Sequence, residues 1–493
     1  MPMDDEEWAR TGIAGLDDVL GGGLPRHRIY LVQGDPGVGK TTVGLQFLLA
    51  GVERGEAVLY ITLSEGKDEI QSVARSHGWS LEGMPLFELS AVDQTASLEE
   101  EYTLFQPADV ELQETTRTLL ARLEQVKPTR VVVDSLSEIR LLSQNSLRYR
   151  RQILALKQHF AGRKCTVLLL DDRTSEAGDL QLQSISHGVV SMEQVPPLYG
   201  EDRRKLRIVK LRGQKFRGGY HDYVIRTGGL EVFPRLVASS HSRQVRGEPL
   251  SSGVAQLDSL LGGGLERGTS TLILGPAGSG KSSIATQYLM ATARRQERAA
   301  LFAFDESIGT LLVRSRGLGL DLDGQVRAGR IILEQIDTAD IGPGEFAHEV
   351  RRRIEVDGVK VVVIDSLNGY LNTMPTERML PVQMHELLAY CGQKGVVTLL
   401  VMAQHGLIGP MQTPVDMSYL SDTVLLLRYF EATGRLRRAL SVMKKRSGAH
   451  EDTIREFSLG PQGVRIGEAL TEFTGVLSGV PQFAGTPEKL FGK

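Results

Sequence analysis

Cysteine is scarce in this chain, and its two cysteines are far apart. Among 493 residues only Cys165 and Cys391 are cysteines, and neither belongs to a metal-ligand motif. Two isolated thiols cannot form a zinc site by themselves, and they are typical of the reduced cysteines of a cytosolic protein. We therefore expect a cytoplasmic protein without a zinc centre built on thiols.

Export signals, membrane spans and a strong net charge are also missing. The N-terminal stretch MPMDDEEWAR is acidic and lacks the basic and apolar regions of a signal peptide. No apolar run reaches the length of a membrane span. The net charge of −3 gives no overall attraction to nucleic acid or anionic membranes, although a local patch would. Hydrophobic content of 41% and a length of 493 residues are typical of a soluble protein with two large domains.

Two glycine-rich loops stand out instead. Gly34–Thr41 (GDPGVGKT) and Gly275–Ser282 (GPAGSGKS) both fit G-x-x-x-x-G-K-[ST], the phosphate-binding P-loop. In such loops the backbone N–H groups face phosphate oxygens, the lysine neutralises the β- and γ-phosphates, and the last hydroxyl binds Mg²⁺. The residues expected to bind ATP are Gly37, Val38, Gly39, Lys40, Thr41 and Thr42 in the first loop and Gly278, Ser279, Gly280, Lys281, Ser282 and Ser283 in the second.

The two loops belong to an internal duplication. A shift of 241 residues lays Thr11–Thr42 on Ser252–Ser283, and fifteen of the 32 positions are then identical. The matches include a G-x-A-x-L-D-x-x-L-G-G-G-L segment upstream of each loop, which phosphate chemistry does not require. Duplication therefore explains the likeness better than a shared P-loop alone.

Short apolar runs and amphipathic segments alternate in each half. Ile29–Gln33 and Thr271–Leu274 enter the glycine loops as buried parallel strands should, and Thr41–Val52 and Ser282–Ala293 follow as helices. This alternation predicts an α/β fold of two tandem P-loop domains, each a mostly parallel sheet covered by helices. The expected division is residues 1–235, a linker over 236–249, residues 250–475, and a short tail over 476–493.

Acidic side chains follow several predicted strands. Asp134 and Asp365 end strands rich in valine, where the aspartate that holds Mg²⁺ through water is expected together with Thr41 and Ser282. The alternative is an aspartate that caps a loop. Glu65 in the first half and the Asp305-Glu306 pair in the second are candidates for orienting or deprotonating the nucleophile, unless they are simply solvated.

The candidate carboxylates differ between the halves. Glu65 and Glu306 obey the 241-residue shift, but Ser64 stands opposite Asp305. The difference predicts that the second site has the fuller set of bases for phosphoryl transfer.

A basic stretch recurs late in each half. Lys210-Leu211-Arg212 and Lys444-Lys445-Arg446 occupy matching places. A lone Lys-x-Arg is commonly a solvated strand edge. Its recurrence favours contact with phosphate, including the ATP of a neighbouring subunit.

These residues together resemble the KaiC family, which comprises double-domain ATPases of the RecA superfamily. The match runs from about Thr11 to about Gly475. Besides the duplicated opening, the Asp305-Glu306-Ser307 run, TMPTERMLPVQMHELL at Thr373–Leu388 and Thr453–Phe457 carry the resemblance.

The resemblance implies a homohexamer of two stacked rings with ATP and Mg²⁺ between subunits. The first ring would be a slow ATPase, and the second an ATPase that also autophosphorylates, with serine/threonine kinase-type activity. Asp305 and Glu306 match the family's catalytic glutamate pair, whereas Ser64 departs from it beside Glu65. The residues Lys210, Arg212, Lys444 and Arg446 match those that contact ATP across the subunit interface.

The resemblance also points to an acceptor for the phosphoryl group. In the family an adjacent Ser-Thr pair precedes a [ST]-D-T run, and here Ser418-Tyr419 precedes Ser421-Asp422-Thr423. Ser418 is therefore the expected acceptor, and the longer Tyr419 side chain should not reach the same in-line position. The chain has only a short stretch, VPQFAGTPEKLFGK, where the clock proteins have a long segment captured by a partner, so the resemblance predicts that this docking segment is absent.

Three functions follow from these patterns. The leading one is an ATPase with serine autokinase activity that works with a signalling or clock protein and with neither specific nucleic acid nor membrane. The second is a recombination or repair ATPase of the wider RecA group, but Gln404–Ser418 has no basic residue except His405, where a DNA-binding loop should carry Lys or Arg. The third is a signalling scaffold whose conformation is set by ATP.

Overall fold

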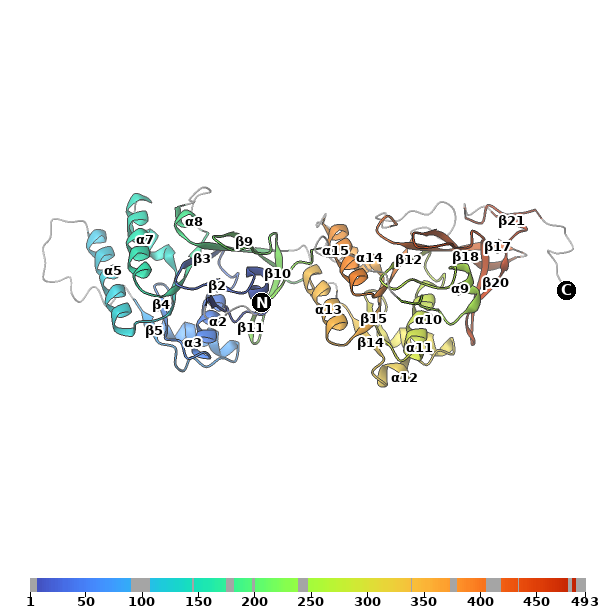
Figure 1. Cartoon of the computed structure of the whole chain (residues 1–493), viewed down its shortest axis with the longest axis horizontal. Coiled ribbons are helices and arrows are strands. Elements are labelled where there is room, and N and C mark those ends of the chain that lie inside the picture. Colours follow the sequence, from blue (N-terminus) through green and yellow to red (C-terminus); the bar gives the residue numbers. More distant parts are fainter. Residues whose placement is uncertain are drawn as a thin grey trace. The chain divides into compact units, whose positions relative to one another are not determined.

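The computed structural model describes residues 7–89, 107–143, 146–173, 181–196, 200–237, 247–337, 339–372, 379–404, 418–432, 434–477 and 481–484. The chain divides between Arg235 and Leu236 into two compact units, called here the first and the second unit (Figure 1).

The first unit is built on a twisted sheet with a parallel core. In the described residues its nine strands lie in the order β11-β10-β9-β8-β3-β7-β6-β4-β5. The strands from β8 to β5 pair in parallel, whereas β9, β10 and β11 add antiparallel neighbours at one edge. Their bounds are β3 Ile29–Gly34, β4 Val58–Thr62, β5 Leu86–Glu88, β6 Arg130–Asp134, β7 Thr166–Asp172, β8 Gly188–Val195, β9 Arg203–Leu211, β10 His221–Arg226 and β11 Gly229–Phe233.

The second unit repeats this sheet strand for strand. Its order in the described residues is β14-β13-β15-β16-β12-β17-β18-β19-β20, which is the first order read from the other edge. The bounds are β12 Ser270–Gly275, β13 Arg298–Ala303, β14 Ile331–Gln335, β15 Val359–Asp365, β16 Val397–Ala403, β17 Thr423–Ala432, β18 Arg435–Lys445, β19 Arg455–Gly460 and β20 Gly463–Ala469. The predicted fold of two tandem, mostly parallel α/β domains is confirmed.

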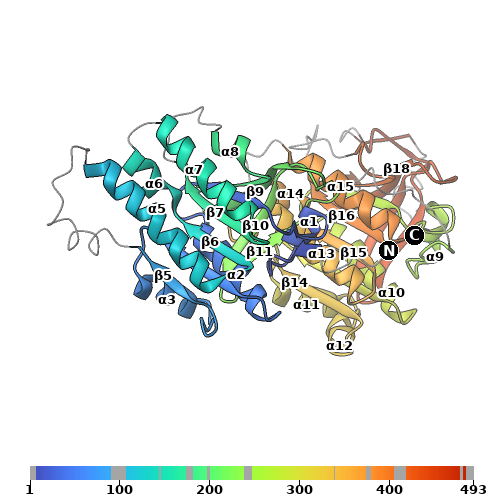
Figure 2. The same cartoon turned by 60° about the vertical axis from the view of Figure 1, so that its left-hand side comes forward.

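Helices cover both faces of each sheet (Figures 1 and 2). In the first unit, α2 and α3 pack on one face and α5, α6 and α7 on the other. In the second unit, α10 and α11 pack on one face and α13, α14 and α15 on the other. The helix bounds are α1 Leu16–Leu20, α2 Lys40–Val52, α3 Lys67–Ser76, α5 Pro107–Val126, α6 Leu136–Ser143, α7 Ser146–Ala161, α8 Gln181–Ile185, α9 Ala255–Leu260, α10 Lys281–Arg294, α11 Ile308–Gly317, α12 Leu322–Arg327, α13 Pro343–Glu355, α14 Leu367–Asn372 and α15 Leu380–Gln393. None of the helices in the described residues combines the length and apolarity needed to cross a membrane.

Side-chain alternation along the central strands explains why their middle positions are apolar on both faces. In β3, Leu31 packs under the α5–α7 layer and Val32 under the α2 layer, and both are buried. In β12, Leu272 and Ile273 divide in the same way between the two cores of the second unit. A strand covered on both faces is apolar along its middle positions, which gives the continuous runs seen in the sequence.

Small antiparallel pairs complete the described structure. β1 (Trp8–Ala9) pairs with β2 (Leu24–Pro25), and β21 (Phe473–Thr474) pairs with β22 (Gln482–Phe483). Several sequence predictions fall partly outside the described residues. These are the linker at 238–246, the resemblance segment at 373–378, the proposed DNA-loop comparison at 405–417, and the tail at 478–480 and 485–493.

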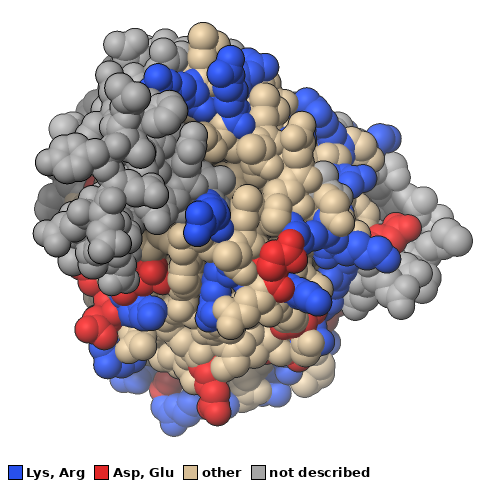
Figure 3. Space-filling view, turned by 90° about the vertical axis from the view of Figure 1, so that its left-hand side faces the viewer, with Lys and Arg blue, Asp and Glu red and all other residues tan. Residues whose placement is uncertain are grey.

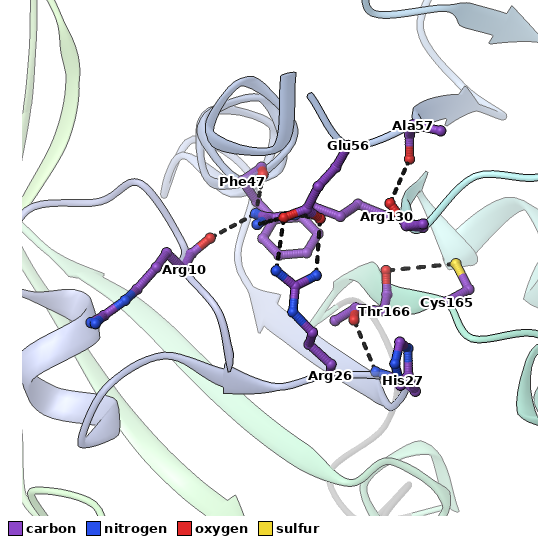
Figure 4. Close-up of polar contacts among 10 residues, drawn as sticks. Arg10, Arg26, His27, Phe47, Glu56, Ala57, Arg130, Cys165 and Thr166 are labelled. Carbon is purple, nitrogen blue, oxygen red and sulfur yellow. Dashed lines mark hydrogen bonds and ion pairs between the residues drawn. The ribbon is translucent and has the colours of Figure 1, made fainter. Parts of the chain in front are cut away.

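A buried ion cluster lies in the first unit (Figure 4). Arg130 at the start of β6 is completely buried, donates to both carboxylate oxygens of Glu56 at 2.7 and 2.9 Å, and lies over the Phe47 ring. Arg26 adds a second bidentate pair to the same carboxylate. Burial raises the pKa of Glu56, but hydrogen bonds and charge from Arg130 and Arg26 outweigh it and hold that pKa at about 2.

Candidate functional site

Each glycine-rich loop joins a central strand to a helix, as the sequence predicted. β3 ends at Gly34 and α2 begins at Lys40, with Gly39 between them at a φ of 91°. The backbone angle favours glycine there, and a Cβ at Gly39 would lie 2.5 Å from Ile225 Cδ1 and displace that side chain. Gly280 of the second loop has a φ of 104°, and a Cβ there would lie 2.6 Å from a Phe457 ring carbon.

The loop lysines are buried against their own backbone. Lys40 Nζ donates to Gly34 O at 2.9 Å and to Asp35 O at 3.0 Å, and Lys281 Nζ donates to Pro276 O at 2.7 Å. Burial lowers the pKa of Lys281 to about 8, although Asp365 opposes the shift. Lys40 has a closer acidic neighbour, because its Nζ lies 2.7 Å from Asp172 Oδ1. The remaining loop residues expected to bind ATP are mostly enclosed: Val38, Thr42, Ser279 and Ser283 are buried.

A hydroxyl and a carboxylate meet where Mg²⁺ is expected. Thr41 Oγ1 donates to Asp134 Oδ2 at 2.8 Å in the first unit, and Ser282 donates to Asp365 in the second. Burial raises the pKa of Asp134, whereas hydrogen bonds from Tyr60 and Thr41 oppose that rise. Within the described part of the chain no group of three or more His, Cys, Asp or Glu forms a metal cage. One carboxylate with one hydroxyl fits Mg²⁺, which in nucleotide sites is held by few protein oxygens together with phosphates.

Tyr60 is a part of this site that the sequence did not reveal. Its hydroxyl donates to Asp134 Oδ2 at 2.6 Å from the neighbouring strand β4. The 241-residue shift places Leu301 at this position of the second unit, so the second aspartate has no phenol partner of this kind. A tyrosine within an apolar strand is usually a core residue, so the sequence alone does not indicate the contact of Tyr60 with Asp134.

The candidate bases differ in their partners. Glu65 follows β4 in a turn that the Thr62 hydroxyl fastens, donating to Glu65 O at 2.6 Å and accepting from Glu65 N at 3.0 Å. Glu65 Oε2 is buried and has no hydrogen-bond partner. Burial raises the pKa of Glu65, and the charges of Asp134, Glu69 and Asp172 raise it further. A carboxyl with a raised pKa and an open oxygen is a better proton acceptor than an ordinary glutamate.

The second unit holds its carboxylates differently. Asp305 Oδ2 accepts a hydrogen bond from Ser366 Oγ, and Glu306 pairs with Arg314 of α11 at 2.6 Å. Arg314 was not found from the sequence, and the 241-residue shift places Val73 in its position. At the position opposite Ser64 the second unit thus has a carboxylate, Asp305, but its glutamate is paired with an arginine.

The Lys-x-Arg residues lie at the opposite end of the central strands from the glycine loops. Leu211 at the end of β9 pairs with Gly188, the first residue of β8, whereas Gly34 is the last residue of the parallel neighbour β3. Lys210 donates to Gln183 O, and Arg212 to Ser184 O at 3.1 Å. In one unit the structure therefore brings Lys40, Thr41, Asp134 and Glu65 together and leaves Lys210 and Arg212 apart from them.

The second unit repeats this arrangement around Ser418. Lys444 Nζ donates to Ser418 O and Ser421 O, both at 2.8 Å, and Arg446 donates to Tyr419 O at 2.7 Å. Ser418 is half-buried, whereas Tyr419 is exposed. The expected acceptor thus lies directly on the recurrent basic pair.

Two residues of the basic stretches, Lys445 and Leu211, point away from the surface that carries Lys444 and Lys210. This corrects the sequence prediction that they contact ATP. The Lys445 side chain is only 1% exposed, and its Nζ lies 2.7 Å from Glu266 Oε1 and donates to Leu261 O at 2.5 Å. Leu211 packs into the first core. Because successive residues of a strand point to opposite faces, Lys445 cannot share the surface of Lys444, so its ammonium is not a phosphate contact.

A cavity of about 140 Å³ adjoins Arg212 in the first unit. Its polar lining consists of His27, Arg28, Lys157 and His187 in addition to Arg212. Burial lowers the pKa of both histidines, and the adjacent arginines and lysines lower it further. The cavity has a cationic lining suited to an anion.

The second unit balances the charge at the corresponding place. Strand register aligns His187 with Asp422, since Gly188 and Thr423 pair with matching residues of the central strands. Asp422 accepts from Ser270 N at 2.9 Å and lies 3.9 Å from Arg446. At this end of the strands the first unit therefore has a histidine where the second has a carboxylate.

A further basic surface lies on the helical face of the first unit. Exposed Arg148, Arg150 and Arg151 begin α7. In the upper part of Figure 3 the coloured charges are Lys and Arg, whereas both signs mix in the lower part. This is a local patch of the kind that the small net charge leaves open.

Comparison with known proteins agrees with this geometry. The family model for the KaiC ATPase matches residues 9–237 and again residues 250–471. The chain belongs to the KaiC ATPase family. The circadian clock protein KaiC3 of Synechocystis sp. is 28% identical over 510 residues, covering 98% of this chain and 96% of that protein. The circadian clock oscillator proteins KaiC of Thermostichus vulcanus and Synechococcus elongatus are 29% and 28% identical, covering 97% of this chain and 92% and 93% of theirs.

Proposed function

We propose that this KaiC-family protein hydrolyses ATP with Mg²⁺ at both glycine loops and transfers a phosphoryl group to its own Ser418. Lys40 and Lys281 would hold the phosphates, and Thr41 with Asp134 and Ser282 with Asp365 would hold the Mg²⁺. The metal, when bound, would neutralise the charge that develops on the transferred phosphoryl group.

The observation that carries the autokinase proposal is the contact between Lys444 and Ser418. Lys444 Nζ is 2.8 Å from Ser418 O, so the expected acceptor and the expected phosphate-binding lysine share one surface. A neighbouring subunit that presents ATP to Lys444 and Arg446 would also present its γ-phosphate near Ser418. Positioning of this kind is most of what phosphoryl transfer requires from a protein.

The separation of the glycine loops from the Lys-x-Arg pairs supports a ring. One unit cannot direct both sets at one nucleotide, because they lie at opposite ends of its central strands. A homohexamer in which each ATP lies between two subunits uses both sets, and it leaves further surface for a signalling or clock partner. We propose this assembly in the cytoplasm.

Mass measurements test the function directly. Native mass spectrometry with ATP and Mg²⁺ should show a hexamer, and intact mass should rise by one phosphoryl group that maps to the Ser418 peptide. Lys281→Ala should abolish this incorporation. A monomer under all nucleotide conditions would overturn the ring, and labelling that survives in Lys281→Ala would overturn the kinase assignment.

The basic patch on α7 supports one alternative function, that of a RecA-type ATPase that acts on DNA. Exposed Arg148, Arg150 and Arg151 should bind DNA at low salt through phosphate contacts. We expect this binding to disappear by about 200 mM salt, as non-specific binding does. Sequence-selective binding or DNA-stimulated hydrolysis above that salt concentration would favour the DNA function.

A further inference from the structure

We propose that Asp172 is the second carboxylate of the first ATP site and does there what Asp305 does in the second site. This inference depends on the proposed function, since it assumes that the first site hydrolyses ATP. The first site then has two carboxylates from two strands, Glu65 and Asp172, instead of the lone base Glu65.

The position of Asp172 follows from strand pairing. Asp172 is the last residue of β7 and pairs with Gly34, the first residue of the glycine loop. Its Oδ1 lies 2.7 Å from Lys40 Nζ, and its side chain is about a quarter exposed. Because the loop lysine is the group that contacts the β- and γ-phosphates, a carboxylate beside it lies at the phosphate end of the site.

The second unit has no acid at this position. Gly275 pairs with Ala403 as Gly34 pairs with Asp172, so alanine replaces the aspartate. The reverse holds after the neighbouring strand, where Ser64 stands opposite Asp305. Each site therefore has two carboxylates besides the aspartate that is expected to hold Mg²⁺. The second of these two carboxylates comes from a different strand in each unit.

A serine connects the second carboxylate to the Mg²⁺-binding strand in both units. In the second unit Ser366, which follows Asp365, donates directly to Asp305 Oδ2. In the first unit Ser135 is hydrogen-bonded to Ser137, and Ser137 donates to Asp172 Oδ2 at 3.2 Å. The residues that follow the Mg²⁺-binding strand thus hydrogen-bond to the second carboxylate in each site. The contact is direct in the second unit and passes through one additional hydroxyl in the first.

The pair Glu65 and Asp172 suits activation of water. In hydrolysis the water oxygen forms a bond to the γ-phosphorus, and the bond from that phosphorus to the β,γ-bridging oxygen breaks to release ADP. One water proton passes to Glu65, whose Oε2 has no hydrogen-bond partner, and later to phosphate or solvent. Asp172 orients the water and, through its negative charge, helps Glu65 to accept the proton.

Kinetics of the first site alone test this role. In the full-length chain with Lys281→Ala, which removes the second site, we expect Asp172→Asn to lower kcat by at least about tenfold, since general-base groups contribute about 10²–10⁴. Affinity for a non-hydrolysable ATP analogue, measured by titration calorimetry, should stay the same or increase, because a negative charge near phosphate has been removed. Loss of affinity with unchanged kcat would overturn the proposal.

A compensating substitution separates catalysis from structure. Adding Ser64→Asp to the Asp172→Asn variant should restore most of the lost kcat, because it places the carboxylate where the second unit has Asp305. Asp171→Asn is the matched control, since Asp171 pairs with Arg140 at 2.6 Å instead of with Lys40. Failure of Ser64→Asp to restore kcat in a variant that binds the analogue normally would overturn the assignment.

The result for the parent variant distinguishes the two proposals. If Lys281→Ala hydrolyses no more ATP than the double variant Lys40→Ala/Lys281→Ala, the first site is not an ATPase and both proposals are overturned. If the parent hydrolyses ATP and Asp172→Asn does so equally well, only the role of Asp172 is overturned.

Discussion

Gln183 occupies in the first unit the position that Ser418 occupies in the second. Lys210 donates to the carbonyl of Gln183, and Lys444 donates to the carbonyl of Ser418. The next residues match too, since Arg212 donates to Ser184 O and Arg446 to Tyr419 O. The basic pair therefore serves both units, but only the second has a hydroxyl side chain at the first of these positions.

This relationship predicts the site of self-phosphorylation. Ser418→Gln, which gives the second unit the residue of the first, should remove the main phosphopeptide in mass spectrometry after incubation with ATP and Mg²⁺. The hexamer should persist, because the contact to Lys444 uses the backbone carbonyl. A full phosphopeptide yield at Tyr419 or elsewhere in this variant would contradict the assignment of Ser418.

The buried cluster of Arg130, Glu56 and Arg26 predicts a large loss of stability when its carboxylate is neutralised. Glu56→Gln should lower the free energy of unfolding of the first unit by about 3–5 kcal/mol at pH 7, because it removes the counter-charge of a completely buried guanidinium. Trp8 and Trp79, the two tryptophans of the chain, both belong to the first unit, so their fluorescence during urea titration reports its unfolding.

The second unit provides the control for this experiment. Arg267 and Glu297 repeat the pair of Arg26 and Glu56, but register places Val361 where Arg130 lies. Glu297→Gln should cost only about 1 kcal/mol and leave the tryptophan transition unchanged. Because the folded pKa of Glu56 is lowered to about 2, its contribution is present above the ordinary glutamate pKa and is lost as pH falls toward 2. Transitions of wild type and Glu56→Gln that stay equally far apart at pH 2 would contradict this account.

The pKa of Lys281 predicts that ATP binding at the second site depends on pH. With a pKa of about 8, Lys281 loses its proton as pH rises from 7 to 9, and phosphate binding must then take up a proton. In a Lys40→Ala background, ATP affinity should fall over this range by up to about tenfold per pH unit above 8. Lys281→Arg should abolish the dependence because arginine stays charged. An equal decline in both variants would assign it to another group.

The hydrogen bond from Tyr60 to Asp134 predicts an effect on Mg²⁺ dependence. This bond lowers the pKa of a carboxylate that burial raises, so Tyr60→Phe should leave Asp134 more readily protonated. In the Lys281→Ala background the Mg²⁺ concentration for half-maximal hydrolysis should increase several-fold at pH 6 and less at pH 8. Tyr30→Phe removes a comparable hydroxyl that donates to Pro25 O at 2.6 Å and should change neither value. A Tyr60→Phe variant with normal Mg²⁺ dependence at pH 6 would disprove the role.

The fold was predictable because its signals are local. Strands covered on both faces form continuous apolar runs, and the predicted strand Ile29–Gln33 coincides with β3 except for one added residue, Gly34. The glycine loops carry their own backbone requirement at Gly39 and Gly280. Because the chain is duplicated, each predicted strand or helix could also be compared with its counterpart in the other half.

The partners within the site were not predictable in the same way. Asp172 meets Lys40 only because β7 lies beside β3, and Tyr60 meets Asp134 only because β4 lies beside β6. Strand order is not encoded in the local pattern of either strand. Lys445 was wrong for a reason that the sequence does contain, since neighbours in a strand face opposite ways.

Placement of the glycine loop and the Lys-x-Arg pair at opposite ends of the central strands has a consequence for rings of mixed subunits. Each subunit of the proposed hexamer contributes half of one site and half of the next. If defective subunits lack only the lysine of the loop, the number of working sites should fall linearly with their share. If the same subunits also lack Arg212, each one disables two sites, and the working fraction should fall as the square of the wild-type share. The activity of mixtures of wild-type and defective subunits would thus test whether the two sets of residues of one subunit serve two different ATP sites.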